Sequence, residues 1–167
     1  MISAKDLSKL IQAAVAARRN AYCPYSRYPV GASVLTGEGK IFAGCNVENA
    51  SSGLSLCAER NAIMNAVAQG HTTIRAVCVV CRSGKPCGAC RQVALEFAAD
   101  GAAFYIVDVG SHSRRHRMLR LPIHKSLPHP FDPLEAELIP KNPSNLLRSA
   151  GASRGRSGPR RARRIAR

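Results

Sequence analysis

The fold is decided by one stretch, residues 57–109: CAERNAIMNAVAQGHTTIRAVCVVCRSGKPCGACRQVALEFAADGAAFYIVDV. Within it, two segments rich in helix-forming residues alternate with two apolar, β-branched segments. The stretch therefore predicts a helix over 58–69, a strand over 74–80, a helix over 88–99 and a strand over 103–109. This alternation is typical of an α/β domain in which helices cover a mixed sheet.

The flanking sequence extends the pattern on both sides. Apolar residues recur at helical spacing before the stretch, which predicts a helix over 4–19. A hairpin is expected next, because Gly37-Glu38-Gly39 separates two strand-like segments, 30–35 and 41–47. Two short elements follow the stretch, a strand over 119–123 and a last helical turn over 134–139.

Charge is unevenly distributed along the 167 residues, whose formal net charge is +15. Residues 141–167 contain nine basic residues and no acidic one, and Ser, Gly, Pro and Arg dominate them. We therefore expect a folded domain over 1–140 and a basic, disordered tail over 141–167. We expect neither a transmembrane helix, which needs about 20 apolar residues, nor a secretory signal peptide.

Seven cysteines, an odd number, favour a metal site or reduced thiols over a disulfide framework. Cys57 begins one predicted helix, and Cys87 and Cys90 begin the next, so the three thiols can meet at one sheet edge. Three thiolates leave an open position on tetrahedral Zn²⁺, as in catalytic zinc sites. Cys78 and Cys81 lie three residues apart on a strand and point to opposite faces, which disfavours a structural zinc ribbon. A redox pair in the Cys-Gly-Ala-Cys segment would leave the first cysteine fragment unexplained.

Charged neighbours complete this candidate zinc site. Glu59 lies two residues after Cys57, where its carboxylate can move a proton between a water and a substrate without binding the metal. Three thiolates and Zn²⁺ carry a net negative charge. Arg60 and Arg91 are placed to offset that charge through hydrogen bonds to the sulfurs.

The two cysteine fragments, Cys57-Ala58-Glu59 and Pro86-Cys87-Gly88-Ala89-Cys90, match the three-cysteine form of the zinc deaminase signature. Two further segments, PYSRYPVGA (24–32) and GCNVENA (44–50), extend the match. With them, residues 5–135 resemble the small, homotetrameric cytidine deaminases. The resemblance implies a three-layer α/β/α cytidine-deaminase-like fold with a mixed five-stranded sheet, one zinc ion per subunit and a cytoplasmic homotetramer.

The resemblance also implies roles for residues around the metal. Asn46 and Glu48 match the pair that holds the ribose hydroxyls, and the Ala58 backbone N–H matches the donor to the pyrimidine 2-oxygen. Glu59 matches the proton shuttle, which protonates ring N3.

Two aromatic residues and two departures from the family pattern are expected around the site. Tyr28 stands where this family usually has a Phe that lines the base, and Phe131 resembles a C-terminal Phe that reaches into a neighbouring subunit's site. Ser52 stands where the family often has Tyr, and Asp132 replaces a usual Gly. The basic tail has no counterpart in the family pattern.

The function that the resemblance implies is zinc-dependent hydrolysis of cytidine and deoxycytidine to uridine and deoxyuridine, with release of ammonia, as in pyrimidine salvage. One alternative is deamination of a nucleoside analogue. Another is deamination of cytosine in a polynucleotide, with the tail binding nucleic acid. We expect a small-molecule nucleoside as the substrate, nucleic acid only as a partner of the tail, and no membrane association.

Overall fold

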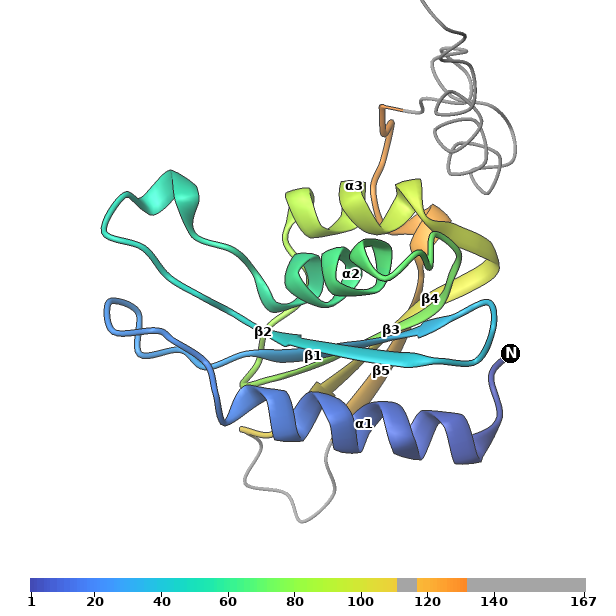
Figure 1. The fold of residues 1–167 in the computed structure, drawn as a ribbon, viewed down its shortest axis with the longest axis horizontal. Helices are drawn as coiled ribbons and strands as arrows, with labels where there is room; N and C mark the ends of the chain where they lie inside the picture. Colours follow the sequence, from blue (N-terminus) through green and yellow to red (C-terminus); the bar gives the residue numbers. More distant parts are fainter. Residues whose placement is uncertain (111–116, 132–167) are drawn as a thin grey trace, which may run out of the picture.

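A five-stranded sheet in the order β2-β1-β3-β4-β5 runs through the protein in a computed structural model, which describes residues 1–110 and 117–131 (Figure 1). The strands are β1 (Gly31–Thr36), β2 (Ile41–Cys45), β3 (Ile74–Cys81), β4 (Ala98–Asp108) and β5 (Arg117–Pro122). The helices are α1 (Ala4–Arg18), α2 (Ala58–Ala68) and α3 (Gly88–Glu96), with short 3-10 turns η1 (Ser52–Leu54) and η2 (Ile123–Lys125). Only β3 and β4 pair in parallel among these strands, so the mixed five-stranded sheet predicted from the sequence is confirmed.

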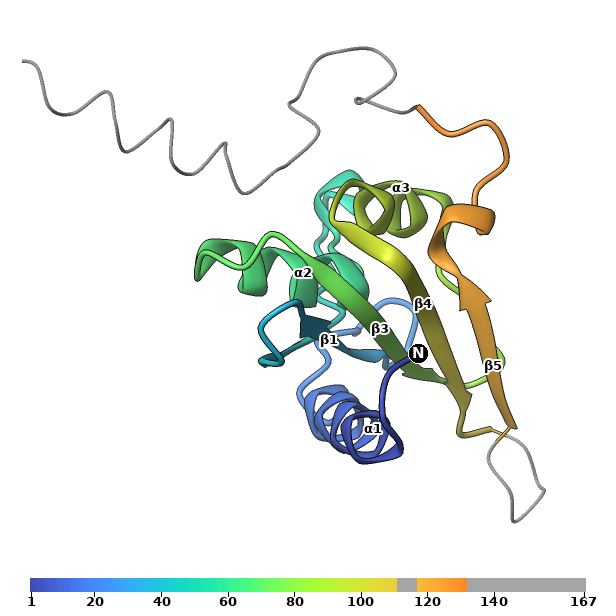
Figure 2. The same ribbon diagram turned by 90° about the vertical axis from the view of Figure 1, so that its right-hand side faces the viewer.

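Helices cover both faces of the sheet. Figures 1 and 2 show α1 on one face and α2 with α3 on the other. Leu10 and Ala14 of α1 are fully buried with Cys78 of β3, whereas Ala62 of α2 packs in a second cluster with Phe104 of β4. The side chains of β3 alternate between these two clusters, as the pleat requires. The α/β/α layering is therefore confirmed.

Two glycines in the hairpin strands let helices approach the sheet closely. A Cβ on Gly31 would meet the Ala14 carbonyl and lie 2.6 Å from the Arg18 amide nitrogen of α1. A Cβ on Gly44 would lie 2.5 Å from the Ala62 amide nitrogen of α2. Gly44 in β2 thereby fixes how close the helix that begins at Cys57 lies to the sheet.

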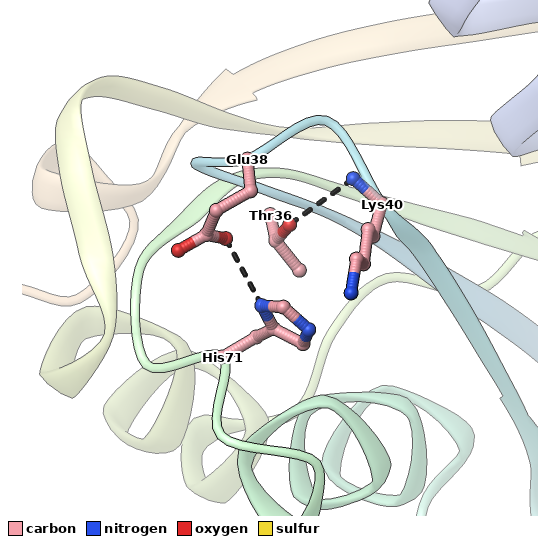
Figure 3. A network of polar contacts seen from close by, with 4 residues as sticks. All are labelled: Thr36, Glu38, Lys40 and His71. Carbon is pink, nitrogen blue, oxygen red and sulfur yellow. Dashed lines mark hydrogen bonds and ion pairs between the residues drawn. The ribbon is translucent and has the colours of Figure 1, made fainter. Parts of the chain in front are cut away.

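The turn of the predicted β1–β2 hairpin is held by polar contacts (Figure 3). Gly39 has a φ of +81°, a conformation that glycine adopts without steric penalty. Lys40 N donates to Thr36 Oγ1 over 3.2 Å, and Glu38 Oε2 lies 3.1 Å from His71 Nδ1. Since His71 follows α2, the contact joins the turn to the end of that helix.

The boundary between α3 and β4 differs from the sequence prediction. A helix was predicted over 88–99, but α3 ends at Glu96 and Ala98 already pairs with Ile74 of β3. The Phe97 carbonyl accepts a hydrogen bond from Ile74 N over 2.7 Å, so sheet pairing overrides the helical propensity of this alanine-rich stretch. The helix predicted over 134–139 lies outside the described residues. None of the helices in the described ranges is long and apolar enough to span a bilayer.

Candidate metal centre and substrate cavity

The three cysteines of the sequence signature meet at one point. The Sγ atoms of Cys57, Cys87 and Cys90 all lie within 4.8 Å of one another. Cys57 is the N-cap of α2, Cys87 is the N-cap of α3, and Cys90 lies in the first turn of α3. These helices precede the parallel strands β3 and β4, so both begin at the sheet edge where those strands end. The topology therefore brings together thiols that are 30 positions apart in the chain.

This donor set fits zinc. Three sulfurs bound at about 2.3 Å in a tetrahedral arrangement lie roughly 3.8 Å apart. The Sγ atoms of Cys57 and Cys87 are 3.9 Å apart, and those of Cys87 and Cys90 are 3.4 Å apart. Three soft donors and no fourth cysteine in the group match a site with one open position. The Cys87 sulfur also accepts a hydrogen bond from the Cys90 backbone N–H, which orients it.

The protein favours a thiolate at this point. A hydrogen bond from the Cys90 thiol lowers the pKa of Cys57 to about 5, and the Arg60 guanidinium contributes in the same direction. Arg60 Nη2 lies 3.9 Å from the Cys57 sulfur and donates to the Ser55 carbonyl over 3.1 Å. Arg60 therefore occupies the position beside the sulfur that the sequence predicted for it.

Glu59 lies next to the thiols, in the first turn of α2. Its side chain is buried, with 4% of the residue exposed. Burial raises the pKa of the Glu59 carboxyl, and the negative charge of Cys57 raises it further. A carboxyl group with a raised pKa can both accept and release a proton near neutral pH.

A cavity of about 340 Å³ opens over the cysteines and Glu59. Its lining includes Cys57, Ala58, Glu59 and Cys87, and Glu48 from the segment after β2. Ala58 is fully buried and is the first residue of α2, so its N–H has no partner within the helix. The cavity therefore has a metal-binding group, a buried carboxyl and a backbone donor side by side.

Asn46 and Glu48 also line this cavity, and both contact the backbone of the segment before β1. Asn46 Oδ1 accepts from Val30 N over 2.8 Å, and its Nδ2 donates to the Tyr28 carbonyl over 3.0 Å. Glu48 Oε2 accepts from the backbone N–H groups of Tyr25 and Ser26, and hydrogen bonds from Ser26 and from the Tyr25 backbone lower its pKa. Hydrogen bonds to the backbone thus hold both side chains at the cavity wall.

Comparison with known proteins identifies this arrangement. Residues 4–106 match the family model of the cytidine and deoxycytidylate deaminase zinc-binding region. The chain belongs to this deaminase family.

Curated relatives and solved structures of the deaminase family agree with that match. The chain is 42% identical to the cytidine deaminase of Sporosarcina psychrophila over 107 residues, which are 62% of this chain and 79% of the relative. It is 44% identical to the cytidine deaminase of Halalkalibacterium halodurans over 104 residues, 60% of this chain and 79% of the relative. The crystal structure of cytidine deaminase from Burkholderia pseudomallei superposes with a TM-score of 0.66 at 41% identity, covering 74% of this chain and 98% of that one.

Three other residues singled out in the sequence make contacts that the sequence did not predict. Tyr28 lines the cavity, but its hydroxyl is directed to the Arg82 carbonyl. Phe131 is 62% exposed and is absent from the cavity lining, and its carbonyl accepts a hydrogen bond from Gln92. Arg91 was predicted to contact the sulfurs, but its hydrogen bonds among the described residues go to the carbonyls of Pro86 and Ser126.

Several cavity residues of this deaminase were not singled out from the sequence. They are Ser26, Val30, Val79, Cys81, Gly84 and Lys85. Cys81 was expected to point away from Cys78, and the structure confirms it, because the two thiols belong to core clusters on opposite faces of the sheet. Strand alternation places Cys78 and Cys81 on opposite faces of the sheet but does not tell which of the two faces the cavity. Cys81 does so because α2 and α3 cover its face.

Proposed function

We propose that this protein is a zinc-dependent enzyme that hydrolyses cytidine and deoxycytidine to uridine and deoxyuridine, with release of ammonia. The observation that carries the proposal is the buried Glu59 carboxyl beside three converging cysteines, in a cavity large enough for a nucleoside. Membership of the deaminase family and cytidine deaminases among its relatives support it.

Zinc held by Cys57, Cys87 and Cys90 would act as a Lewis acid toward water. Glu59 then accepts a proton from the attacking water and delivers it to N3 of the cytosine ring. As the C4–N bond breaks, the amino group takes up the remaining proton of the former water and leaves as ammonia, and the oxygen stays at C4 as the carbonyl oxygen. Burial of Glu59 supports this role, since a raised pKa brings the carboxyl closer to the pH of the reaction.

The other site residues orient the nucleoside. The free N–H of Ala58 is a donor for the pyrimidine 2-oxygen. Asn46 and Glu48 offer an amide and a carboxylate to the ribose hydroxyls, which donate and accept hydrogen bonds. Glu48 Oε2 already accepts two backbone N–H groups, so Oε1 is the oxygen that we assign to the sugar.

The function is tested by ammonia release from cytidine together with zinc analysis. Glu59→Gln keeps the shape of the side chain but removes the proton acceptor, so we expect bound zinc to be retained and kcat to fall by about 10³-fold. Full activity of Glu59→Gln would refute the proton-shuttle role. A cytosine-containing single strand and nucleoside analogues are assayed in parallel, and activity on either without activity on cytidine would refute the choice of substrate.

Assembly and location are proposed on separate grounds. We propose a homotetramer on the family resemblance, and large exposed apolar side chains such as Leu54, Met64 and Phe131 are available for subunit contacts. Phe131 would then contribute to a neighbouring subunit's cavity. We propose a cytoplasmic location because all seven cysteines are free, which suits a reducing compartment.

We further propose that the chain divides into a catalytic domain over 1–140 and a basic tail over 141–167. The tail's nine basic residues without an acidic one support electrostatic attraction to polyanions such as nucleic acid. The tail is not required for deamination, because every residue to which we assign a catalytic role precedes residue 132.

A further inference from the structure

The loop from Arg82 to Pro86 connects β3 to Cys87 and has an unusual backbone. Ser83 has a φ of +54°, a left-handed conformation that is strained for a non-glycine residue. Such a residue persists only where its surroundings hold it. The contacts that hold Ser83 therefore decide where the loop places the Cys87 sulfur.

Two side chains from other elements hold the peptide group between Arg82 and Ser83, one at its N–H and the other at its carbonyl. Asp108 Oδ1, at the end of β4, accepts a hydrogen bond from Ser83 N over 3.0 Å. The Tyr28 hydroxyl, from the segment before β1, donates to the carbonyl of Arg82. The peptide group that precedes the strained residue is thus tied on one side to the end of β4 and on the other to the segment before β1.

Tyr28 also packs against the far side of this loop. A Cβ on Gly84 would lie 2.5 Å from the Tyr28 hydroxyl oxygen and 2.7 Å from Cys81 Sγ. Only a residue without a side chain fits between the loop and this hydroxyl. Tyr28, Cys81 and Gly84 all line the cavity, so this contact is part of its wall.

We infer that Tyr28 is a positioning residue for the metal centre: its hydroxyl fixes the 82–86 loop and thereby the position of Cys87. The inference rests on the proposed zinc site. It assigns the hydroxyl a role distinct from that of the ring, which lines the cavity. A Phe at position 28 would keep the ring and lose the tether.

Zinc retention tests the inference on the full-length, zinc-loaded protein. In Tyr28→Phe we expect a chromogenic zinc chelator to remove the ion about tenfold faster, since residues that orient metal ligands typically change metal affinity 10- to 100-fold. KM for cytidine should change less than twofold because the ring remains. Tyr22→Phe is the matched control, since it removes a hydroxyl from a side chain that is 56% exposed. An altered KM with unchanged zinc release would overturn the inference in favour of a contact between the hydroxyl and the substrate.

A second pair of measurements is independent of the chemistry. Hydrogen exchange of the metal-free protein should show faster exchange of Ser83 N–H in Tyr28→Phe than in wild type; equal exchange would overturn the tether even if the enzyme deaminates cytidine as proposed. Gly84→Ala should also speed zinc release, but by a smaller factor in the Tyr28→Phe background, where the hydroxyl no longer obstructs the new Cβ. If the effects of Tyr28→Phe and Gly84→Ala on the rate of zinc release multiply in the double variant, the two residues do not contact each other, and the inference fails. Failure of the proposed deaminase function would leave the non-multiplicative effect on zinc release unchanged.

Discussion

Arg60 and Arg91 each follow a ligand-bearing fragment in the sequence, but they do different things. Arg60 reaches the Cys57 sulfur, whereas Arg91 ties the start of α3 to η2 by donating over 2.8 Å to the carbonyls of Pro86 and Ser126. A cation beside a thiolate affects metal binding. A cation that donates hydrogen bonds to two backbone carbonyls contributes to folding stability.

Substituting each of the two arginines therefore tests whether it acts on zinc binding or on folding stability. We expect Arg60→Gln to weaken zinc binding about tenfold, because the charge that offsets the thiolates is lost. Arg91→Gln should lower the free energy of unfolding by about 2 kcal/mol and leave zinc affinity within twofold of wild type. Chelator competition and urea unfolding measure the two quantities. Equal zinc affinities in the two variants would contradict the assignment.

Residue identities were predictable, but residue contacts were not. The sequence identified the three ligand cysteines from their spacing, and Asn46 and Glu48 through the family motif. In the structure Asn46, Glu48, Cys57 and Cys87 line one cavity, and the sulfurs of the three cysteines lie within 4.8 Å of one another. It could not show that Asn46 and Glu48 hold the backbone of the segment before β1, because those bonds depend on how two loops pack. Nor could it show where the Tyr28 hydroxyl goes, since Arg82 is 54 positions away in the chain.

At the scale of elements, periodicity located each helix and strand of the described ranges to within a few residues, except at the α3–β4 boundary. There, Ala98 belongs to a stretch with the composition of a helix but pairs with Ile74 at the start of β3. Its conformation is set by a strand about 24 positions earlier, through the Ile74–Ala98 pairing. Local propensity carries no information about such a partner.

The packing of α2 on β2 gives a prediction at this scale. Gly44→Ala places a Cβ 2.5 Å from the Ala62 amide nitrogen, so α2 must shift away from the sheet. We expect the free energy of unfolding to fall by about 1–3 kcal/mol, as for other overpacked cores. Gly53→Ala is the control, since its Cβ would meet nothing within 4 Å. Urea unfolding of both variants checks the difference, and a Gly44→Ala protein as stable as Gly53→Ala would contradict this packing.

Since α2 carries Cys57 and Glu59, the same variant should also lose activity. A displacement of the helix start by a fraction of an ångström misplaces both a ligand and the proton shuttle. We expect kcat at saturating zinc to fall more than tenfold. The ammonia assay at increasing zinc concentration separates a misplaced carboxyl from simple loss of metal.

At the scale of the whole molecule, zinc should act as a cross-link between α2 and α3. The ion binds the folded state only, so at 1,000 times its dissociation constant it should add about 4 kcal/mol to the free energy of unfolding. We expect a chelator to lower the melting temperature by several degrees, and added zinc to restore it. In Cys87→Ser, which retains two of the three thiols, the chelator should change the melting temperature far less. A melting temperature insensitive to chelation in wild type would contradict a stabilising metal.

The basic tail gives a second prediction at this scale. Deletion of residues 141–167 removes nine basic residues and no acidic one. We expect kcat and KM for cytidine to stay within twofold of the full-length values, while binding to a polyanion such as heparin weakens and loses most of its salt dependence. Steady-state kinetics and salt-gradient elution from heparin test the two parts. A tenfold loss of kcat on deletion would contradict a tail without a catalytic role.

The cavity is built from two kinds of structure, and this division bears on how such an enzyme can diversify. The thiols and Glu59 belong to helix starts anchored on the sheet, whereas the wall that carries Asn46 and Glu48 comes from the segments before β1 and after β2. Those segments are joined by single bridges such as Tyr22–Val47 and Val47–Leu56. Loops on a rigid scaffold tolerate substitution better than the elements that carry them. Selection or engineering can therefore remodel what the enzyme accepts by changing residues of 21–30 and 46–56 other than Tyr28, while the reacting groups keep their places.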